Sequence, residues 1–474
     1  MTFDSAIARS YVSDKWVNSI TPALVDYIAV PALSPAFDPE WESSGYLQTV
    51  VETTKAWIEQ QPVVGMTSSI HTLAGRTPLL VVEVEAFGTA TTDRTAVLYG
   101  HLDKQPEMTG WREDLGPWKP VIEGTRLYGR GGADDGYAAF ASITAIGAVQ
   151  QAGGSHARCV LLIELSEESG SPDLPFHVEA LAEWLGDVDF VVCLDSGCAT
   201  FDTMWLTSSL RGLVDGTIKV EVVEEGVHSG IASGVVPSSF RIMRQILDRL
   251  EDSVTGQVLL PSATVEIPAY RVAEAEQVVS EFGAAALDPF PIVDGLELMT
   301  GSTTEAMIAR TWKPAMSVIG ADGMPSTGLA GNVLRPGTSL KVSFRIPPTA
   351  DQDAVLAELR QLVEEDTPSN ARVSLERTEA ASGWNAPDLA PWLDNALAGA
   401  CSEAFGQPHQ LYGEGGSIPF MGMLGERFPE AQFVITGVLG PETNAHGPNE
   451  FLELAYAERL TGAIAHIVNA HGSR

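Results

Sequence analysis

The sequence is poor in basic residues compared with acidic ones. It has 28 lysines and arginines against 62 aspartates and glutamates, which gives a formal net charge of −34. A surface this acidic repels nucleic-acid phosphates and anionic lipid, so nucleic acid and membranes are disfavoured as partners. We expect small-molecule ligands instead.

Cysteine and long apolar runs are also scarce. The four cysteines are Cys159, Cys193, Cys198 and Cys401, and no two of them form a CxxC pair. So few cysteines do not make a disulfide framework, and we expect free thiols in a reducing compartment. No 18 apolar residues run together, and the first residues lack the basic start and apolar core of a signal peptide. The sequence predicts a soluble, cytoplasmic protein.

The chain is long enough for two or three domains of about 150 residues each. Up to about residue 210, apolar runs alternate with helical stretches, as in a sheet covered by helices. Three nearly all-apolar runs end in polar residues, at the sequences HLD, SEES and DSG. They predict an α/β fold with a mixed, mostly parallel sheet sandwiched by helices, and a site at the carboxyl ends of its strands.

The middle of the chain has a different pattern. Between residues 211 and 385, strands with a period of two alternate with amphipathic helices, which predicts a separate, inserted α+β domain. The section 253–330 is rich in glycine and proline, and its pattern predicts no element. We expect residues 1–210 and 386–474 to form one domain, completed by the last segment of the chain.

Two candidate site motifs contain a histidine or paired acids near a strand end. His101-Leu-Asp103 places both polar side chains on one face, where a carboxylate can support a metal-bound imidazole. Taken alone, a surface histidine explains it equally well. The second motif, Gly-Arg-Gly-Gly-Ala-Asp134-Asp135, lacks a dinucleotide or Walker pattern. Its acids either cap a helix or face the sheet edge, where a cation would neutralise them.

Three further motifs complete the set. Glu167-Glu168 follows an apolar strand, so one glutamate can bind a metal while its neighbour acts as a general base; a solvated pair is the simple alternative. Asp195 stands at another strand end, and His446 lies in a turn-rich loop. Two histidines and three or four carboxylates at one sheet edge suit two divalent cations. The +4 charge of the two cations would be balanced by three carboxylates and one hydroxide.

The order of these motifs resembles a dinuclear-zinc metallopeptidase family. This family includes carnosinase-like cytosolic dipeptidases, aminoacylases, succinyl-diaminopimelate desuccinylase and carboxypeptidase G, and the dipeptidase branch is the most similar. The resemblance spans almost the whole chain and implies two divalent metal ions per subunit, zinc first, with manganese or cobalt as alternatives. It also implies a cis peptide after Asp134.

The resemblance assigns a role to each motif residue. One metal would bind His101 and Asp195, the other Glu168 and His446, and Asp134 would bridge both. Asp103 would orient His101. Glu167 would activate the metal-bridging hydroxide and pass the proton to the leaving amine.

The same resemblance extends to residues outside the metal set. Residues 1–210 and 386–474 would be the catalytic, metal-binding domain, and the inserted domain 211–385 would be a lid and dimerisation domain. His228 would reach the partner subunit's site and polarise the scissile carbonyl, which implies a homodimer through this lid domain. Arg345 would bind the substrate carboxylate, with Asn332 as a further lid contact. Glu414 would meet a substrate amine, and Ser417 the carboxylate end.

Two departures from the dipeptidase branch leave the preferred substrate side chain open. Gly136 and Tyr137 follow the acid pair where lysine and glycine are usual. Trp384 and Asn385 occupy the region where some dipeptidases place another lid histidine.

The predicted function is hydrolysis of the amide bond of dipeptides or short peptides next to a free C-terminal carboxylate. An N-acyl-amino-acid amidohydrolase of the aminoacylase or desuccinylase type is the alternative, and Glu414 favours a free ammonium over an acyl group. A non-catalytic binding protein is disfavoured because neither Glu167 nor a metal ligand is missing. A phosphoesterase is disfavoured because Arg345 is the only clear cationic anchor.

Overall fold

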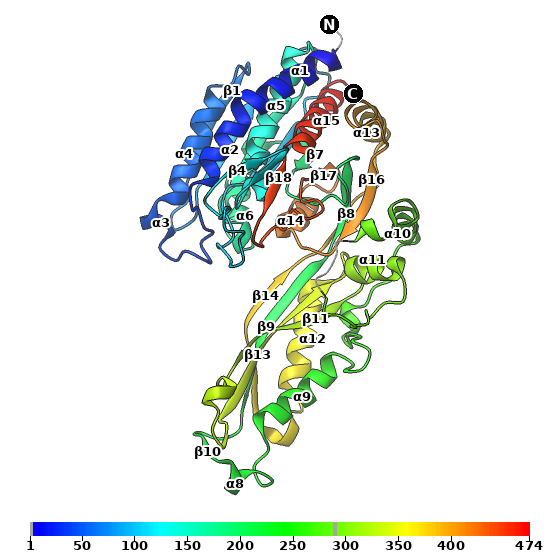
Figure 1. The fold of residues 1–474 in the computed structure, drawn as a ribbon. Helices are drawn as coiled ribbons and strands as arrows, with labels where there is room; N and C mark the ends of the chain where they lie inside the picture. The colour runs from blue at the N-terminus through cyan, green and yellow to red at the C-terminus, as the bar shows by residue number, and fades with distance from the viewer. Residues whose placement is uncertain (1–2, 288–291) are drawn as a thin grey trace.

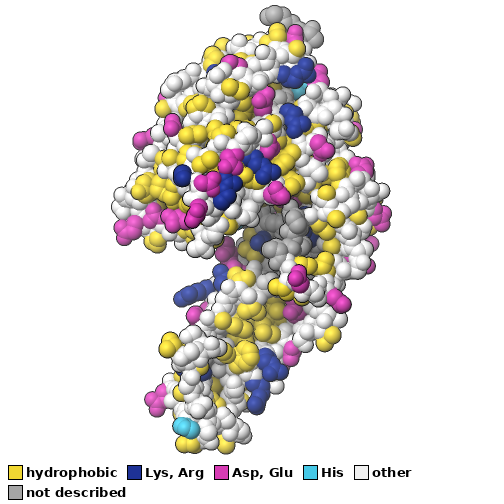
Figure 2. All heavy atoms as spheres, in the orientation of Figure 1, with side chains coloured by type: hydrophobic (Ala, Val, Ile, Leu, Met, Phe, Trp, Pro, Cys, Tyr) yellow, Lys and Arg dark blue, Asp and Glu magenta, His cyan; other side chains and the backbone are white. Residues whose placement is uncertain are grey.

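The computed structural model describes residues 3–287 and 292–474, which form two bodies (Figure 1). The upper body contains the six-stranded sheet, and both chain termini lie there. The lower body contains a four-stranded sheet made from the middle of the chain. Acidic side chains are spread over both bodies on the face shown in Figure 2.

The sheet of the upper body has the strand order β1-β2-β6-β3-β7-β17. Its strands are β1 (Met66–His71), β2 (Leu79–Val84), β3 (Thr95–His101), β6 (Arg158–Glu164), β7 (Val188–Cys193) and β17 (Gln432–Ile435). Strands β6, β3, β7 and β17 run parallel, whereas β1 and β2 are antiparallel neighbours. The predicted mixed, mostly parallel sheet is confirmed.

Both faces of this sheet are covered by helices, so its strands are apolar throughout. Within β3, Leu98 packs into one core, whereas Val97 and Tyr99 pack into the other. The first face carries α1 (Ser5–Lys15), α4 (Tyr46–Glu59), α5 (Tyr137–Gln151), α13 (Pro391–Ala404) and α15 (Leu454–Gly472). The second carries α6 (Leu174–Ala180) and α14 (Pro419–Arg427).

Helix α5 explains the small-residue run of the sequence. Residues 137–150 are all buried, because α5 lies between the sheet and the helices α1 and α15. Alanine and glycine at these positions allow the neighbouring helices to approach closely.

The lower body is an antiparallel sheet with helices on one face. Its strand order is β11 (Ala315–Asp322), β13 (Gly337–Ile346), β9 (Gly212–Glu221) and β14 (Arg372–Ala381). The helices are α9 (Ser239–Leu250) and α12 (Gln352–Glu364). Buried and partly exposed residues alternate along β13, which confirms the period of two seen in the sequence.

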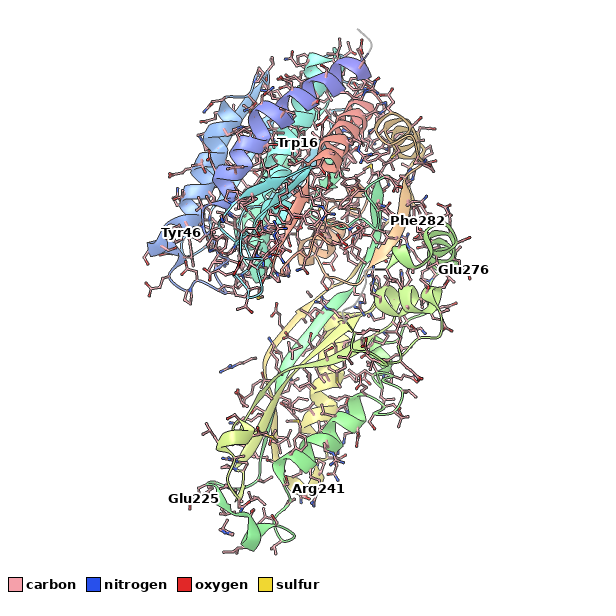
Figure 3. The ribbon with its side chains drawn as sticks, in the orientation of Figure 1. Trp16, Tyr46, Glu225, Arg241, Glu276 and Phe282 are labelled. Carbon is pink, nitrogen blue, oxygen red and sulfur yellow. The ribbon has the colours of Figure 1, made fainter. Side chains whose placement is uncertain are left out.

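The section without predicted elements contains two helices that contact the upper body. Helices α10 (Ala269–Phe282) and α11 (Thr303–Trp312) lie beside β16 (Gln410–Glu414). Phe282 points toward this strand (Figure 3), and its ring centroid lies 4.8 Å from that of Trp205. The predicted domain limits at 211 and 385 stay a prediction, since this part of the predicted insertion packs on the upper body.

Among the described residues, no helix has the length and apolar character needed to cross a membrane.

Trp16 joins the N-terminal helices to α15, and its removal tests this packing. It is 2% exposed, and its indole donates to the Thr461 hydroxyl at 3.0 Å (Figure 3). We expect Trp16→Ala to lower the free energy of unfolding by about 3–5 kcal/mol, because it leaves a large cavity. Equilibrium urea unfolding measures this loss. The adjacent Val17, which is 64% exposed, is the control. A similar loss in Val17→Ala would contradict this account.

Candidate metal centre

Three neighbouring parallel strands deliver the predicted residues to one edge of the upper sheet. Strand β3 ends at His101, β6 leads into the 3-10 turn Glu167–Ser169, and β7 ends two residues before Asp195. Because β6, β3 and β7 are adjacent, their carboxyl ends meet at this edge. The shared geometry explains why side chains far apart in sequence come together.

Asp134 lies between two groups of candidate ligands. His101 Nε2 is 3.3 Å from Asp134 Oδ1 and 3.8 Å from Asp195 Oδ2. His446 Nε2 is 3.0 Å from Asp134 Oδ2 and 3.2 Å from Glu168 Oε2. Each carboxylate oxygen of Asp134 therefore faces a different imidazole, and each group could hold one metal ion.

Asp103 connects the two sides of this cluster. Its Oδ1 lies 3.4 Å from His101 Nδ1, and its backbone carbonyl lies 3.1 Å from the same nitrogen. Its carboxylate also accepts hydrogen bonds from the backbone N–H groups of Glu167 and Glu168, at 3.1 and 3.0 Å. The residue thus orients an imidazole and fixes the turn that bears both glutamates. The peptide after Asp134 is cis, as predicted.

Buried negative charge dominates the electrostatics of the cluster. The side chains of Asp134, Glu168 and Asp195 are at most 8% exposed. Burial, together with the charges of Asp134 and Glu168, raises the pKa of Asp195 to about 8. Burial lowers the pKa of His446, but hydrogen bonds to Asp134 and Glu168 outweigh it and raise that pKa to about 11. The cluster therefore favours cations strongly.

The donor set fits two divalent cations. Each group offers one imidazole nitrogen and carboxylate oxygens within 4.8 Å of one another. Glu168 Oε1 is buried without a hydrogen-bond partner in the described part of the chain, so it can accept a further interaction. Nitrogen and oxygen ligands of this kind suit zinc and manganese.

An ion pair that the sequence did not single out holds two of the ligand loops together. Arg130 Nη1 pairs with the Glu450 carboxylate, which also accepts from the backbone N–H of Gly131 at 2.8 Å. Arg130 Nη2 donates to the carbonyl of Gly447 at 2.8 Å. The pair therefore links the turn before Asp134 to the loop of His446. Arg130 is the arginine of the Gly-Arg-Gly motif before Asp134, and Glu450 follows His446 by four residues, so the available signal was the closeness of each partner to a candidate ligand.

Two residues directly after Asp103 also support the cluster and were missed. Gln105 Nε2 donates to Glu168 Oε2 at 2.7 Å, so it orients a candidate ligand. The buried Lys104 ammonium donates to the carbonyls of Tyr27 and Val30, both at 2.8 Å. Burial holds the pKa of Lys104 well below its usual value. Neither contact has a sequence pattern, because each depends on a distant segment.

A pocket next to the cluster contains two of the predicted substrate residues. Arg345 and Glu414 line a cavity of about 460 Å³ between the two bodies. Arg345 Nη1 donates to the Ser417 hydroxyl at 2.8 Å. Glu414 Oε1 accepts from the backbone N–H of Gly197 at 2.9 Å and from the Tyr412 hydroxyl at 2.6 Å.

The sequence argument that Arg345 is the only clear cationic anchor was wrong. Arg211 and Arg310 line the same pocket. They come from other elements of the chain, the β8–β9 junction and α11, so nothing in their local sequence indicated a shared pocket.

His228 and Asn332 lie at the far end of the lower body, away from the metal cluster of the same chain (Figure 1). His228 belongs to β10 (Val227–His228), which pairs with β12 (Val333–Leu334). Both residues are exposed, and Asn332 accepts a hydrogen bond from the backbone N–H of Ser229 at 2.9 Å. Glu225, labelled in Figure 3, marks this tip. The structure therefore places the other predicted residues in two groups, one at the ligand cluster and one at the pocket of Arg345, and these two residues in neither.

Comparison with known proteins agrees with this geometry. The model of the family described as Peptidase family M20/M25/M40 matches residues 97–470. A Cysteinylglycine-S-conjugate dipeptidase of Corynebacterium striatum is 26% identical over 393 residues, which cover 80% of this chain and 81% of that protein. A Beta-Ala-His dipeptidase of Homo sapiens is 26% identical over 364 residues, covering 74% of this chain and 69% of the relative.

Two solved structures share the fold along its whole length. The di-peptidase Dug1p from Saccharomyces cerevisiae matches with a TM-score of 0.78 at 20% identity. The matched part covers 100% of this chain and 99% of the Dug1p chain. Human carnosine dipeptidase 1 matches with a TM-score of 0.75 at 20% identity, and the matched part covers 99% of this chain and 98% of the human chain. These likenesses confirm the α/β architecture.

Replacing Gln105 tests its support of the cluster. We expect Gln105→Ala to weaken metal affinity roughly 10- to 100-fold, because Glu168 loses the donor that orients it. Competition with a metal chelator measures the dissociation constant. The control is Gln48→Ala, which removes an exposed side chain bonded only to Glu52 in the described structure. Equal affinities in wild type and Gln105→Ala would contradict this role.

Proposed function

The chain belongs to peptidase family M20/M25/M40, and we propose that it hydrolyses the amide bond of dipeptides next to a free C-terminal carboxylate. The observation that carries this proposal is the pair of ligand groups sharing Asp134, beside a pocket that contains Arg345. The relatives named as dipeptidases support the substrate class.

We assign two divalent metal ions to the cluster, with zinc as the first choice and manganese or cobalt as alternatives. His101 and Asp195 would hold one ion, Glu168 and His446 the other, and Asp134 would contact both. When bound, these ions supply Lewis acidity for the scissile carbonyl and lower the pKa of water.

Glu167 is the proposed general base. The hydrogen bond from its backbone N–H to Asp103 fixes its position beside the ligands. Burial, with the charge of Asp195, raises the pKa of its carboxyl well above the usual value, which favours proton uptake. Glu167 then takes a proton from the attacking water and delivers it to the nitrogen of the leaving amine.

Substrate orientation comes from the pocket. The guanidinium of Arg345, held by the Ser417 hydroxyl, would bind the terminal carboxylate. Glu414 would contact the ammonium group at the other end of a dipeptide. Its Oε1 already accepts several protein hydrogen bonds, so this contact would use its remaining acceptor capacity.

The site of one subunit would be completed by a second copy of the chain. His228 and Asn332 are exposed at the tip of the lower body, where they do not reach the ligands of their own chain (Figure 1). His228 Nδ1 accepts from the backbone N–H of Gly230 at 3.1 Å, so this tautomer has Nε2 as its donor. A homodimer formed through the lower body would bring that donor to the carbonyl oxygen of a substrate in the partner.

A reducing cytoplasm is the proposed location. All four cysteines are buried, and none forms a disulfide in the described part of the chain, as expected in a reducing compartment.

The competing activity is hydrolysis of N-acyl amino acids, which needs no ammonium-binding group. Glu414 favours the dipeptide. Turnover of dipeptides and of the matched N-acetyl and N-succinyl amino acids decides between the two, and faster turnover of the acyl compounds would reject the dipeptidase proposal.

The general base can be tested with an isosteric variant. We expect Glu167→Gln to lower kcat by about 10²–10⁴, because the amide cannot take the proton, while metal content stays at the wild-type level. Steady-state kinetics on a dipeptide and elemental analysis give the two quantities. Glu42→Gln, at an exposed helix position, is the control. Full activity of Glu167→Gln would remove Glu167 from this role.

Sharing of the site between subunits predicts complementation. His228→Ala and Glu167→Gln homodimers should both be inactive. Random co-assembly should restore about one quarter of wild-type activity, because half of the dimers then contain one intact hybrid site. Activity of the unselected co-expressed mixture measures this, and mixed dimers purified through a different tag on each subunit should have about half of wild-type activity. No recovery in mixed dimers would contradict a His228 contribution across subunits.

A further inference from the structure

Three arginines from separate elements line the pocket beside the metal cluster. Arg211 lies between β8 and β9, Arg310 on α11 and Arg345 on β13. The chain has 28 lysines and arginines against 62 acids, so a pocket with three arginines and one glutamate differs sharply from the rest of the molecule. Binding of one terminal carboxylate requires only Arg345.

Two of these arginines donate hydrogen bonds to neutral acceptors. Arg211 Nε donates to the carbonyl of Gly415 at 3.0 Å, and its Nη1 to the carbonyl of Lys313 at 3.4 Å. Arg345 Nη1 donates to the Ser417 hydroxyl. Five N–H donors are available on each guanidinium, so both retain donors for a ligand.

No acid of the described segments forms an ion pair with Arg211 or Arg345. Glu414 shares their pocket, but its Oε1 faces the backbone of Gly197 and the hydroxyl of Tyr412. Asp215, the acid that acts on Arg345 through its charge, pairs with Lys341 at 3.1 Å. A largely buried guanidinium without a counter-charge is unfavourable, and a ligand carboxylate would relieve this cost.

Gly415 allows two of the arginines to lie close together. A Cβ at this position would be 2.9 Å from Arg310 Cγ and 3.2 Å from Arg211 Nη2. Burial, followed by the charges of Arg345 and Arg310, lowers the pKa of Arg211 to about 10. The charges of Arg345 and Arg310 therefore act on Arg211 inside the pocket.

The lining of the pocket follows the metal cluster closely along the chain. The pocket begins at Gly197, two residues after the candidate ligand Asp195. Two residues of chain span about 7 Å at most, which is also the length of a dipeptide. A substrate carbonyl at the cluster would place the C-terminal residue in the pocket, with its main-chain carboxylate at Arg345.

We propose that this pocket selects dipeptides whose C-terminal residue is aspartate or glutamate, with Arg211 and Arg310 binding the side-chain carboxylate. This inference rests on the proposed dipeptidase function. Bidentate binding by a guanidinium distinguishes a carboxylate from the amide of the same shape.

The test compares kcat/KM for Ala-Glu and Ala-Gln, with Glu-Ala and Gln-Ala as the reversed pair, at fixed ionic strength and with metal supplied. Ala-Glu should be cleaved at least about tenfold more efficiently than Ala-Gln, because charged hydrogen bonds are roughly twice as strong as neutral ones. The reversed pair should show no such preference. A ratio near one for Ala-Glu over Ala-Gln, or a larger ratio for the reversed pair, would overturn the assignment.

Variants connect the preference to the pocket. Arg211→Gln should reduce the Ala-Glu to Ala-Gln ratio several-fold, and Arg310→Gln provides a second test if Arg211→Gln does not fold. Both kcat/KM values are measured on the same preparation of each variant, so a reduced fraction of active enzyme lowers both equally and leaves their ratio unchanged. Arg241→Gln, at an exposed position on α9 (Figure 3), removes the same charge and should keep the wild-type ratio.

The outcomes separate this inference from the dipeptidase proposal. Cleavage of Ala-Gln and Ala-Ala without preference for Ala-Glu would overturn only the acidic pocket. An unchanged ratio in both pocket variants would do the same. No cleavage of any dipeptide by the metal-loaded enzyme would overturn both proposals.

Discussion

Three carboxylates are buried within a few ångströms of one another, and their mutual repulsion is the constraint that organises the upper body. Burial and neighbouring charge oppose the ionisation of Glu168 and Asp195 and raise their pKa values, whereas hydrogen bonds from His101 and His446 outweigh burial and lower the pKa of Asp134. The two imidazoles offset the negative charge only in part. Two divalent cations that share Asp134 as a ligand would balance the negative charge. Metal binding and the stability of this sheet edge would therefore depend on each other.

The surrounding structure serves to keep these ligands aligned. The parallel strands β6, β3 and β7 bring their carboxyl ends to one edge. Asp103 fixes the turn of the two glutamates, and the ion pair of Arg130 with Glu450 ties the remaining two ligand loops together. These contacts come from distant segments, so they form only when the whole upper body has folded.

The sequence predicted the features that have a local pattern. Buried strands followed by polar residues indicated the sheet edge. The motifs of His101, Asp134, Glu168, Asp195 and His446 indicated a set of metal ligands, and the structure brings these side chains together in two groups that could each hold an ion. Contacts between distant residues had no such pattern. Gln105, Lys104 and Arg211 each act through partners far away in the chain, and helices α10 and α11 lie in a section whose glycines and prolines obscure any period. The position of His228 at the tip of the lower body likewise follows from tertiary structure alone.

Metal stoichiometry tests the central claim most directly. Elemental analysis of the dialysed wild type, compared with Asp134→Ala, counts the ions and their dependence on the shared ligand. The account predicts two divalent ions per wild-type chain and the loss of both, or of all but a small fraction, in Asp134→Ala. A wild type that holds one ion or none after loading, or an Asp134→Ala variant that retains two, would contradict it.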